Sequence, residues 1–266
     1  MRRRHGSLLI TPLFVVGACV GQTGGDAIDF PVAAVGPTNA VAGQPLACSD
    51  DGGWAVTLTQ ASLHLGAVYL NQSQPVSGGQ AIGCYLTGTY LAQETSVLDV
   101  DLLSPTAQRF PSPAHGITEP PALVGQVWLT HGDINTVPDR MPILTIAGTA
   151  AQNGQSVSFS GSISIGPNRQ TAGGAVAGGD PICKERIVTP IRAALSIERT
   201  GGLLVTVDPC RLFTNVDFSL LPAGTSPGTF EFSDDPTSAD YTQPSKNLYA
   251  NLRNTGPYTF SWSPDL

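Results

Sequence analysis

The sequence predicts an all-β protein, an antiparallel β-sandwich of the immunoglobulin-like or jelly-roll-like kind. Apolar residues recur with period two in many short segments, as at Trp54, Val56 and Leu58, and this spacing is typical of half-buried strands. The chain also holds 30 glycines and 22 prolines, which supply frequent turns. Strands do not alternate regularly with amphipathic helices, so the pattern does not indicate a Rossmann fold or an α/β barrel.

Period-two segments separated by turn residues predict about eleven short strands and at most one short helix. The clearest segments are 28–35, 54–59, 123–130, 143–150, 157–165, 203–207, 216–220, 229–232 and 258–262. Asn153-Gly154 is a favoured hairpin turn because both residues accept positive φ, and residues 199–202 predict a second hairpin. Residues 245–252 are the expected helix, with Ser245 as its cap.

The first twenty residues have the pattern of an export signal. Three arginines at positions 2–4 precede an apolar stretch at 7–16, which is far shorter than a membrane span. The stretch ends in Val16-Gly17-Ala18-Cys19, which resembles the lipobox of bacterial lipoproteins. The resemblance implies cleavage before Cys19 and attachment of diacylglyceryl and palmitate-type acyl groups to that cysteine. Val20, where an aspartate commonly directs retention in the inner membrane, favours the outer membrane.

This reading divides the chain into a signal peptide at 1–18, a lipidated tether at 19–27 and a single β-sandwich domain at 28–266. Loss of the three signal arginines leaves 10 basic against 20 acidic residues, a net charge of −10. So acidic a protein is a poor partner for nucleic acid or for an anionic lipid surface. We therefore expect the protein to bind the membrane through its lipid anchor and not through a basic protein surface.

Four cysteines remain once Cys19 carries lipid, and an even number in an oxidising compartment predicts two disulfides. Cys48, Cys84, Cys183 and Cys210 allow three pairings. We expect Cys48–Cys84 and Cys183–Cys210, because each pair flanks a strand-like block and closes a moderate loop. No two of these cysteines have CxxC spacing, so a zinc site made of cysteines is not favoured.

A transition-metal site is the first alternative to a purely structural or binding role. Its candidate ligands are His64, His115, His131 and Asp133, since histidine is the commonest transition-metal ligand. His131 and Asp133 lie together at the end of a strand, and His115 lies in a proline-rich segment. The HxH and HExxH spacings of dedicated metal sites are absent.

Two other patterns bear on catalysis. Asp99 and Asp101 project from one face of a strand, roughly 7 Å apart, and could serve a hydrolase as paired carboxylates. The segment from Gly224 to Gly228 fits GxSxG, but prolines surround it and a strand follows, so a plain turn is expected rather than a nucleophile elbow. No phosphate loop, dinucleotide fingerprint or haem motif is present, and no cofactor is predicted.

The stretch from Trp54 to Leu70 resembles poorly characterised envelope lipoproteins of high-GC Gram-negative bacteria, and this resemblance implies no chemistry. The sequence therefore predicts a non-enzymatic, lipid-anchored outer-membrane protein facing the periplasm or the cell surface. Its expected role is to bind an envelope protein or a small ligand, or to serve a structural purpose. A periplasmic metal carrier and a secreted hydrolase are the alternatives.

Overall fold

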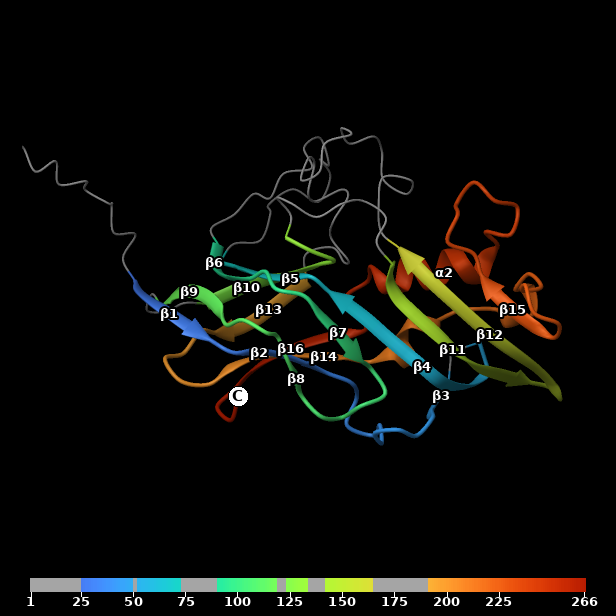
Figure 1. Ribbon diagram of the computed structural model, residues 1–266, viewed down its shortest axis with the longest axis horizontal. Coiled ribbons are helices and arrows are strands. Elements are labelled where there is room, and N and C mark those ends of the chain that lie inside the picture. The colour runs from blue at the N-terminus through green and yellow to red at the C-terminus, as the bar shows by residue number, and fades with distance from the viewer. Residues whose placement is uncertain (1–24, 50–51, 73–89, 119–122, 134–141, 165–190) are drawn as a thin grey trace, which may run out of the picture.

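The computed structural model describes residues 25–49, 52–72, 90–118, 123–133, 142–164 and 191–266. These residues form an all-β fold of sixteen strands in three sheets with sandwich-like packing (Figure 1). The predicted class is confirmed, with more strands than the eleven expected. Two strand pairs are parallel, β2 (Val32–Val35) with β14 (Gly202–Val207) and β12 (Gln155–Ser164) with β15 (Thr229–Phe232). Two of the three sheets are therefore mixed, and the third is wholly antiparallel.

Sheet A has the order β1-β9-β6-β5-β10-β13. Its strands are β1 (Asp26–Phe30), β9 (Ala114–Thr118), β6 (Tyr90–Glu94), β5 (Ala67–Asn71), β10 (Leu123–Thr130) and β13 (Ile191–Ser196). Sheet B has the order β16-β14-β2-β8. Its strands are β16 (Tyr258–Ser263), β14 (Gly202–Val207), β2 (Val32–Val35) and β8 (Gln108–Arg109).

Sheet C has the order β15-β12-β11-β4-β3, and β7 also pairs with β4. Its strands are β15 (Thr229–Phe232), β12 (Gln155–Ser164), β11 (Pro142–Gln152), β4 (Ala55–Leu65), β3 (Leu46–Ser49) and β7 (Leu98–Asp101). The turn between β11 and β12 is the expected one, with Asn153 at φ 51° and Gly154 at φ 80°. Positive φ at both positions suits a tight hairpin.

The chain passes from sheet C to sheet A at Gly66, which separates β4 from β5. A Cβ atom there would lie 2.0 Å from the carbonyl carbon of His131 and 2.1 Å from the nitrogen of Gly132. Only glycine allows the end of β10 to approach so closely. The backbone N–H of Gly66 also donates to the carbonyl of Thr130, at 2.8 Å. This corner places the end of β4 beside the end of β10.

One continuous hydrophobic core joins the three sheets, because every other residue of most strands points inward. Leu58 and Leu63 of sheet C, Val205 of sheet B and Leu129 of sheet A are all fully buried. Toward the end of the molecule that carries β15, the core becomes aromatic and includes Phe159, Phe213, Phe218 and Phe232.

The segment after β14 is held by a row of amide side chains. It contains two 3₁₀ helices, η1 (Pro209–Phe213) and η2 (Phe218–Leu220), and packs against α2 (Gln243–Leu252). Gln243 and Asn247 each donate to the carbonyl of Asn215. Asn251 donates to the carbonyls of Leu212 and Thr214, at 3.0 and 2.8 Å.

Three sequence expectations are corrected here. Residues 199–202 do not close a hairpin, because β13 pairs with β10 in sheet A whereas β14 pairs with β2 and β16 in sheet B. Residues 216–220 do not form a strand: residues 218–220 form η2, because the Asp217 side chain accepts the N–H of Ser219 and starts a helical turn. The helix begins at Gln243, with Thr242 at its cap position, and Ser245 is instead buried and accepts the N–H of Ser233.

Candidate functional site

Buried polar side chains gather on one face of sheet A, and we call this set the β5–β10 polar face. It consists of Tyr69, Asn71, Gln126, Trp128 and Thr130, all at most 2% exposed. Tyr69 lies opposite Trp128, and Asn71 lies opposite Gln126. The alternate residues of the same strands, such as Val127 and Leu129, belong to the hydrophobic core on the other face. A strand that is apolar on one side and polar on the other normally turns its polar side to water, and this one does not.

Asn71 is the residue of this face whose surroundings most need an explanation. Its side chain is 2% exposed, and its Nδ2 has no hydrogen-bond partner in the part of the chain that the structure describes. A buried donor without a partner costs about 1–3 kcal/mol. Such groups are rare in folded proteins and call for an explanation, which a bound ligand or an ordered water can supply.

An aromatic and acidic group adjoins Asn71 on this face. The Tyr69 hydroxyl donates to Oδ1 of Asp133 at 3.5 Å, a long hydrogen bond, and the Tyr69 ring packs edge-on against Tyr90 with 5.7 Å between centroids. Burial raises the pKa of Tyr90 to about 12. A phenol, an indole, two amides and a carboxylate therefore share one surface, and such groups can orient a polar ligand by hydrogen bonding.

His131 and Asp133 directly follow β10. His131 is fully buried, and the hydroxyl of Thr130 fixes the turn by donating to the carbonyl of Gly132 at 2.6 Å. Because Gly66 packs against the backbone of His131, both residues lie near the corner between sheets A and C. These two of the four predicted metal ligands are thus brought beside the β5–β10 polar face.

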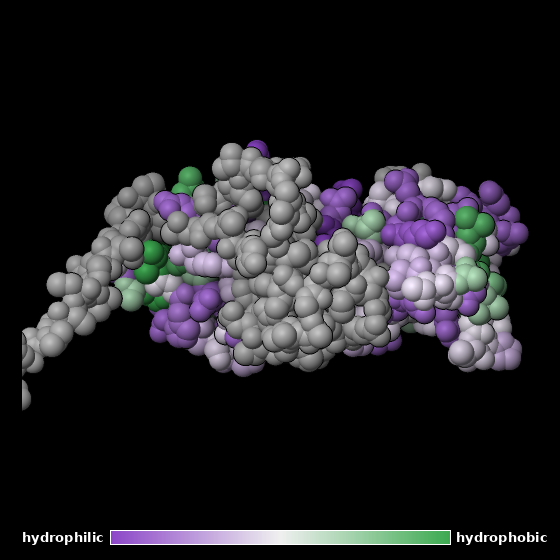
Figure 2. Space-filling view, turned by 90° about the horizontal axis from the view of Figure 1, so that it is seen from above, coloured by the Kyte–Doolittle hydropathy of each residue, from purple (hydrophilic) through white to green (hydrophobic). Residues whose placement is uncertain are grey.

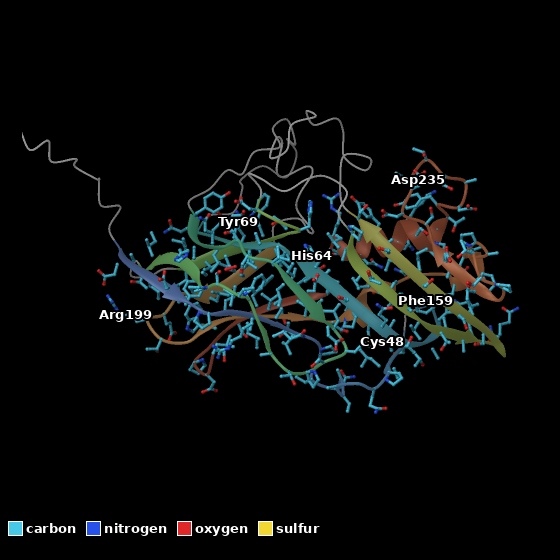
Figure 3. All side chains as sticks on the ribbon, viewed as in Figure 1. Cys48, His64, Tyr69, Phe159, Arg199 and Asp235 are labelled. Carbon is cyan, nitrogen blue, oxygen red and sulfur yellow. A yellow bond between two sulfur atoms is a disulfide. The ribbon has the colours of Figure 1, made fainter. Side chains whose placement is uncertain are left out.

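The other two predicted ligands each form a cross-strand pair with an aspartate. His64 of β4, which is labelled in Figure 3, faces Asp99 of β7, and its Nδ1 lies 2.7 Å from Oδ1 of that carboxylate. His115 of β9 faces Asp29 of β1 with the same 2.7 Å separation. The His64 side chain is only 16% exposed, whereas that of His115 is 69% exposed.

The four candidates do not form one metal cluster. The described ranges contain no group of three or more histidine, cysteine, aspartate and glutamate residues placed to hold a metal ion. His64 lies near the corner that holds His131, while His115 lies on β9, separated from β5 by β6. The arrangement His Nδ1 to carboxylate is nevertheless the one that orients a metal-binding imidazole through its other nitrogen.

Asp99 and Asp101 are exposed on the outer face of sheet C. Asp99 is engaged with His64, and Oδ1 of Asp101 accepts the backbone N–H of Leu103 at 2.9 Å. Asp101 borders a groove and Asp99 does not. The GxSxG segment is a turn, as expected, because Gly228 has φ 77° and Thr229 donates to the carbonyl of Ser226.

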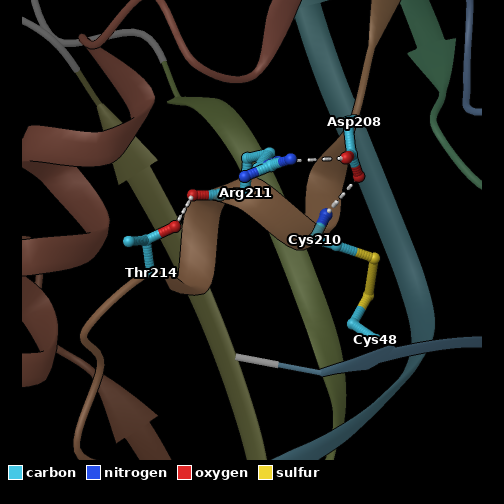
Figure 4. The surroundings of a disulfide bond; sticks show 5 residues. All are labelled: Cys48, Asp208, Cys210, Arg211 and Thr214. Atoms are coloured by element: carbon cyan, nitrogen blue, oxygen red, sulfur yellow. Dashed lines mark hydrogen bonds and ion pairs between the residues drawn. A yellow bond between two sulfur atoms is a disulfide. The ribbon is translucent and has the colours of Figure 1, made fainter. Parts of the chain in front are cut away.

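The disulfide in the described residues joins Cys48 to Cys210, with 5.3 Å between the Cα atoms (Figure 4). This corrects the expected pairing of Cys48 with Cys84 and of Cys183 with Cys210. The separation of the cysteines along the sequence did not predict the pairing, because η1 brings Cys210 to the edge strand β3. Asp208 fixes that turn by accepting the N–H of Cys210 at 3.0 Å. Cys19, Cys84 and Cys183 lie outside the described residues.

Tyr69, Asn71 and Gln126 are not recognisable as site residues from the sequence alone. The available signal is weak: Gln126 and Thr130 interrupt an otherwise apolar segment at 123–130, and Asn71 ends another. Those positions fit a solvated strand face equally well. Only the pairing of β5 with β10 shows that they meet, and only their burial distinguishes them from an ordinary surface.

Comparisons with known proteins identify no family. Neither a protein-family profile nor a curated protein sequence matches the chain. Among solved structures, the chain is similar to MbnP from Methylosinus trichosporium, with 13% sequence identity and a TM-score of 0.41 over 90% of this chain and 99% of that one. That similarity is too low to establish a common fold. No helix in the described residues has the length and apolar character needed to cross a membrane.

Proposed function

We propose that this protein is a lipid-anchored binding protein of the cell envelope, with its ligand site on the β5–β10 polar face. The observation that carries the proposal is Asn71, a buried amide whose Nδ2 lacks a partner among the described residues. A donor that costs stability and has no partner among the described residues is understandable if it binds a ligand.

The chemistry of the face restricts the ligand. Asn71 offers an unused donor, so the ligand supplies an acceptor oxygen or nitrogen at that point. Tyr69, Trp128 and Tyr90 offer aromatic surface beside it. A small polar molecule with an apolar or planar part fits this combination. The proposal assigns binding and orientation to these residues and no bond-making step.

Asn71→Leu tests this role, because leucine has a similar size and no polar atom. If Asn71 is retained for a ligand, the ligand-free variant is more stable than the natural protein toward urea. Ser245→Ala is the matched control, since Ser245 is equally buried but accepts the N–H of Ser233, and its loss lowers stability. Native mass spectrometry of protein extracted from its own cells then shows a bound mass that Asn71→Leu lacks. A destabilised Asn71→Leu variant and an absent bound mass contradict the proposal.

A metal carrier is the second candidate, favoured by the geometry of His64. Its Nδ1 is held by Asp99, which leaves Nε2 to face a ligand, and its side chain is mostly buried near His131. Metal analysis after purification tests it: a stoichiometric transition metal is lost in both His64→Ala and His131→Ala and kept in His115→Ala. Metal content that is absent, or insensitive to His64, rules this candidate out.

The anchor is a separate part of the proposal and rests on the lipobox-like residues at 16–19. Mass spectrometry of the mature N-terminus is expected to show acylated Cys19, and Cys19→Ala is expected to leave the protein unlipidated. An intact, unmodified Met1 contradicts the anchor without affecting the binding face. Outer-membrane residence follows from Val20 and is checked by separating the inner and outer membranes.

A further inference from the structure

A groove of about 380 Å³ opens at the edge of sheet C, away from the β5–β10 polar face. Its walls are the chain before β3, at residues 43–45, and the end of β7 with Leu103. Its floor is the middle of β4, from Thr59 to Ser62. All of these residues belong to the described part of the chain.

The groove exists because the strand that should flank β4 is interrupted. Both β3 and β7 run antiparallel to β4 on the same side of it (Figure 1). Along β4, the pairing with β3 reaches only Leu58, and the pairing with β7 begins at Ser62. Residues 59–61 lie between, with one hydrogen bond from the N–H of Leu102 to the carbonyl of Ala61. Pro45 lacks an N–H and so cannot extend the ladder of β3.

A β-bulge in β4 exposes two consecutive side chains in the floor of the groove. The register between β4 and β11 shifts so that Leu58 faces Gly148 and Gln60 faces Ala147, which leaves Thr59 as the extra residue. Thr59 and Gln60 are consecutive and both exposed, although neighbouring residues in a regular strand point to opposite faces. Bulges of this kind often re-aim side chains at binding sites.

The charge of the groove restricts the kind of group that it can bind. Among the described residues that line the groove, Asp101 is the ionisable one, and its carboxylate is already oriented by the N–H of Leu103. The whole chain has a formal net charge of −7. A cationic group is therefore the complement of this wall, and the gap of three residues spans roughly 10 Å of extended chain.

We infer that this groove binds an extended peptide segment of a partner protein, which adds as a short strand to the open edge of β4. The peptide backbone pairs with residues 59–60, and a lysine or arginine side chain of the peptide meets the Asp101 carboxylate. Strand addition of this kind draws its affinity from backbone hydrogen bonds and its specificity from side-chain pockets.

Retention of synthetic peptides on the immobilised mature protein tests this inference. The probe is a pool of N-acetylated, C-amidated pentapeptides with lysine fixed at the centre and mixed residues around it. A second pool has glutamate at the centre, and a third repeats the lysine pool with N-methylated backbone at every second residue. We expect retention of the first pool alone, because glutamate is repelled by Asp101 and N-methylation removes the backbone donors.

Two matched variants separate a local contact from general electrostatic attraction. Asp101→Asn keeps the oxygen that accepts the N–H of Leu103, and is expected to weaken binding of a retained peptide about threefold to fivefold, as for loss of an exposed ion pair. Asp240→Asn removes the same charge at an exposed position outside the groove, and leaves binding unchanged. Equal effects of the two variants, retention of the N-methylated pool, or no retention of the lysine pool would each overturn the inference.

Discussion

Tyr90 lies on the same face of sheet A as Asn71, because the register of β5 and β6 shifts between Leu70 and Asn71. This irregularity places Tyr90 opposite Asn71 and brings its ring against Tyr69. Partial burial disfavours the phenolate and raises the pKa of Tyr90 from 10.0 to about 12. The ring therefore stays neutral at any physiological pH and borders the proposed ligand site as an uncharged group.

The raised pKa of Tyr90 predicts how the protein responds to alkali. The folded protein holds the phenol proton more tightly than the unfolded chain does, so this contribution to stability is complete below pH 10 and is lost as the pH rises toward 12. Tyr90→Phe cannot titrate and is expected to lose less stability over this range, as measured by urea unfolding at a series of pH values. Burial also raises the pKa of Tyr258, which is common to both proteins and cancels in the comparison. Parallel losses in the two proteins contradict the assignment.

Single residues also show where sequence reasoning ends. Asp99 and Asp101 lie on one exposed strand face, as the alternation of β7 predicts. The buried state of Asn71 and Gln126 was not predictable, because a polar residue in an alternating strand normally marks the solvent face. Whether these residues are buried depends on what covers the sheet. That is a property of the tertiary structure, and the neighbouring sequence does not indicate it.

Among the elements, the corner from β4 to β5 sets the position of the candidate site. Gly66 lets the end of β10 cross close to the chain, so His64, His131 and Asp133 share one region although they come from separate segments. The period-two pattern runs through residues 55–71 and predicts strand structure on both sides of Gly66. It contains no information about the change of sheet, because the change depends on the approach of a distant strand.

Gly66→Ala tests this corner. The added Cβ would meet the backbone of His131 and Gly132, which cannot rotate away, so we expect a loss of more than about 2 kcal/mol in the free energy of unfolding. Gly256→Ala is the control, because nothing lies within 4 Å of its Cβ position. Its stability should stay within about 0.5 kcal/mol of the natural protein. Two variants of equal stability contradict the close approach.

The amide row on α2 gives a second prediction at this scale. Asn251 donates to the carbonyls of Leu212 and Thr214, and Asn251→Ala should lower stability by about 1–3 kcal/mol despite the better helix propensity of alanine. Lys246→Ala, in the same helix, removes only a contact over the Tyr241 ring and should change stability much less. Thermal unfolding followed by circular dichroism compares them, and a neutral Asn251→Ala would show that water replaces the lost donor.

For the whole molecule, composition and periodicity were sufficient for the class and for many strand positions. Segments 123–130 and 229–232 coincide with β10 and β15. Topology was not accessible, since the parallel pairs β2–β14 and β12–β15 join segments that lie far apart in the sequence. The prediction of the disulfide pairing was wrong for the same reason, because a disulfide depends on which distant segments meet.

With Cys48 bound to Cys210, the prediction of two disulfides leaves only Cys84–Cys183 for the second bond. A protease that cuts before aspartate separates all four cysteines, since aspartates lie at positions 50, 51, 99, 180, 208 and 217. Mass spectrometry of the unreduced digest should show the 208–216 peptide joined to the peptide that contains Cys48. It should also show a second joined pair that contains Cys84 and Cys183. Free thiols at Cys84 and Cys183 contradict the second bond.

Reduction of the Cys48–Cys210 bond should have a clear energetic cost. Its partners are 162 residues apart, and closing so long a loop restricts the unfolded chain strongly. We expect Cys48→Ala with Cys210→Ala to lower the free energy of unfolding by about 2–5 kcal/mol. Urea unfolding measures the loss. An unchanged midpoint would mean that the bond adds nothing to the packing of η1 against β3.

The Cys48–Cys210 bond and the β2–β14 pair also determine when this protein can fold. β2 is complete after 35 residues, yet its parallel partner β14 ends at residue 207 and the partner of Cys48 lies at residue 210. During synthesis, β2 can pair with β8 early, but its other edge must wait for β14 until about three quarters of the chain has been made. A product that stops before residue 202 lacks β14, β16 and the partner of Cys48, so we expect it not to reach the native fold.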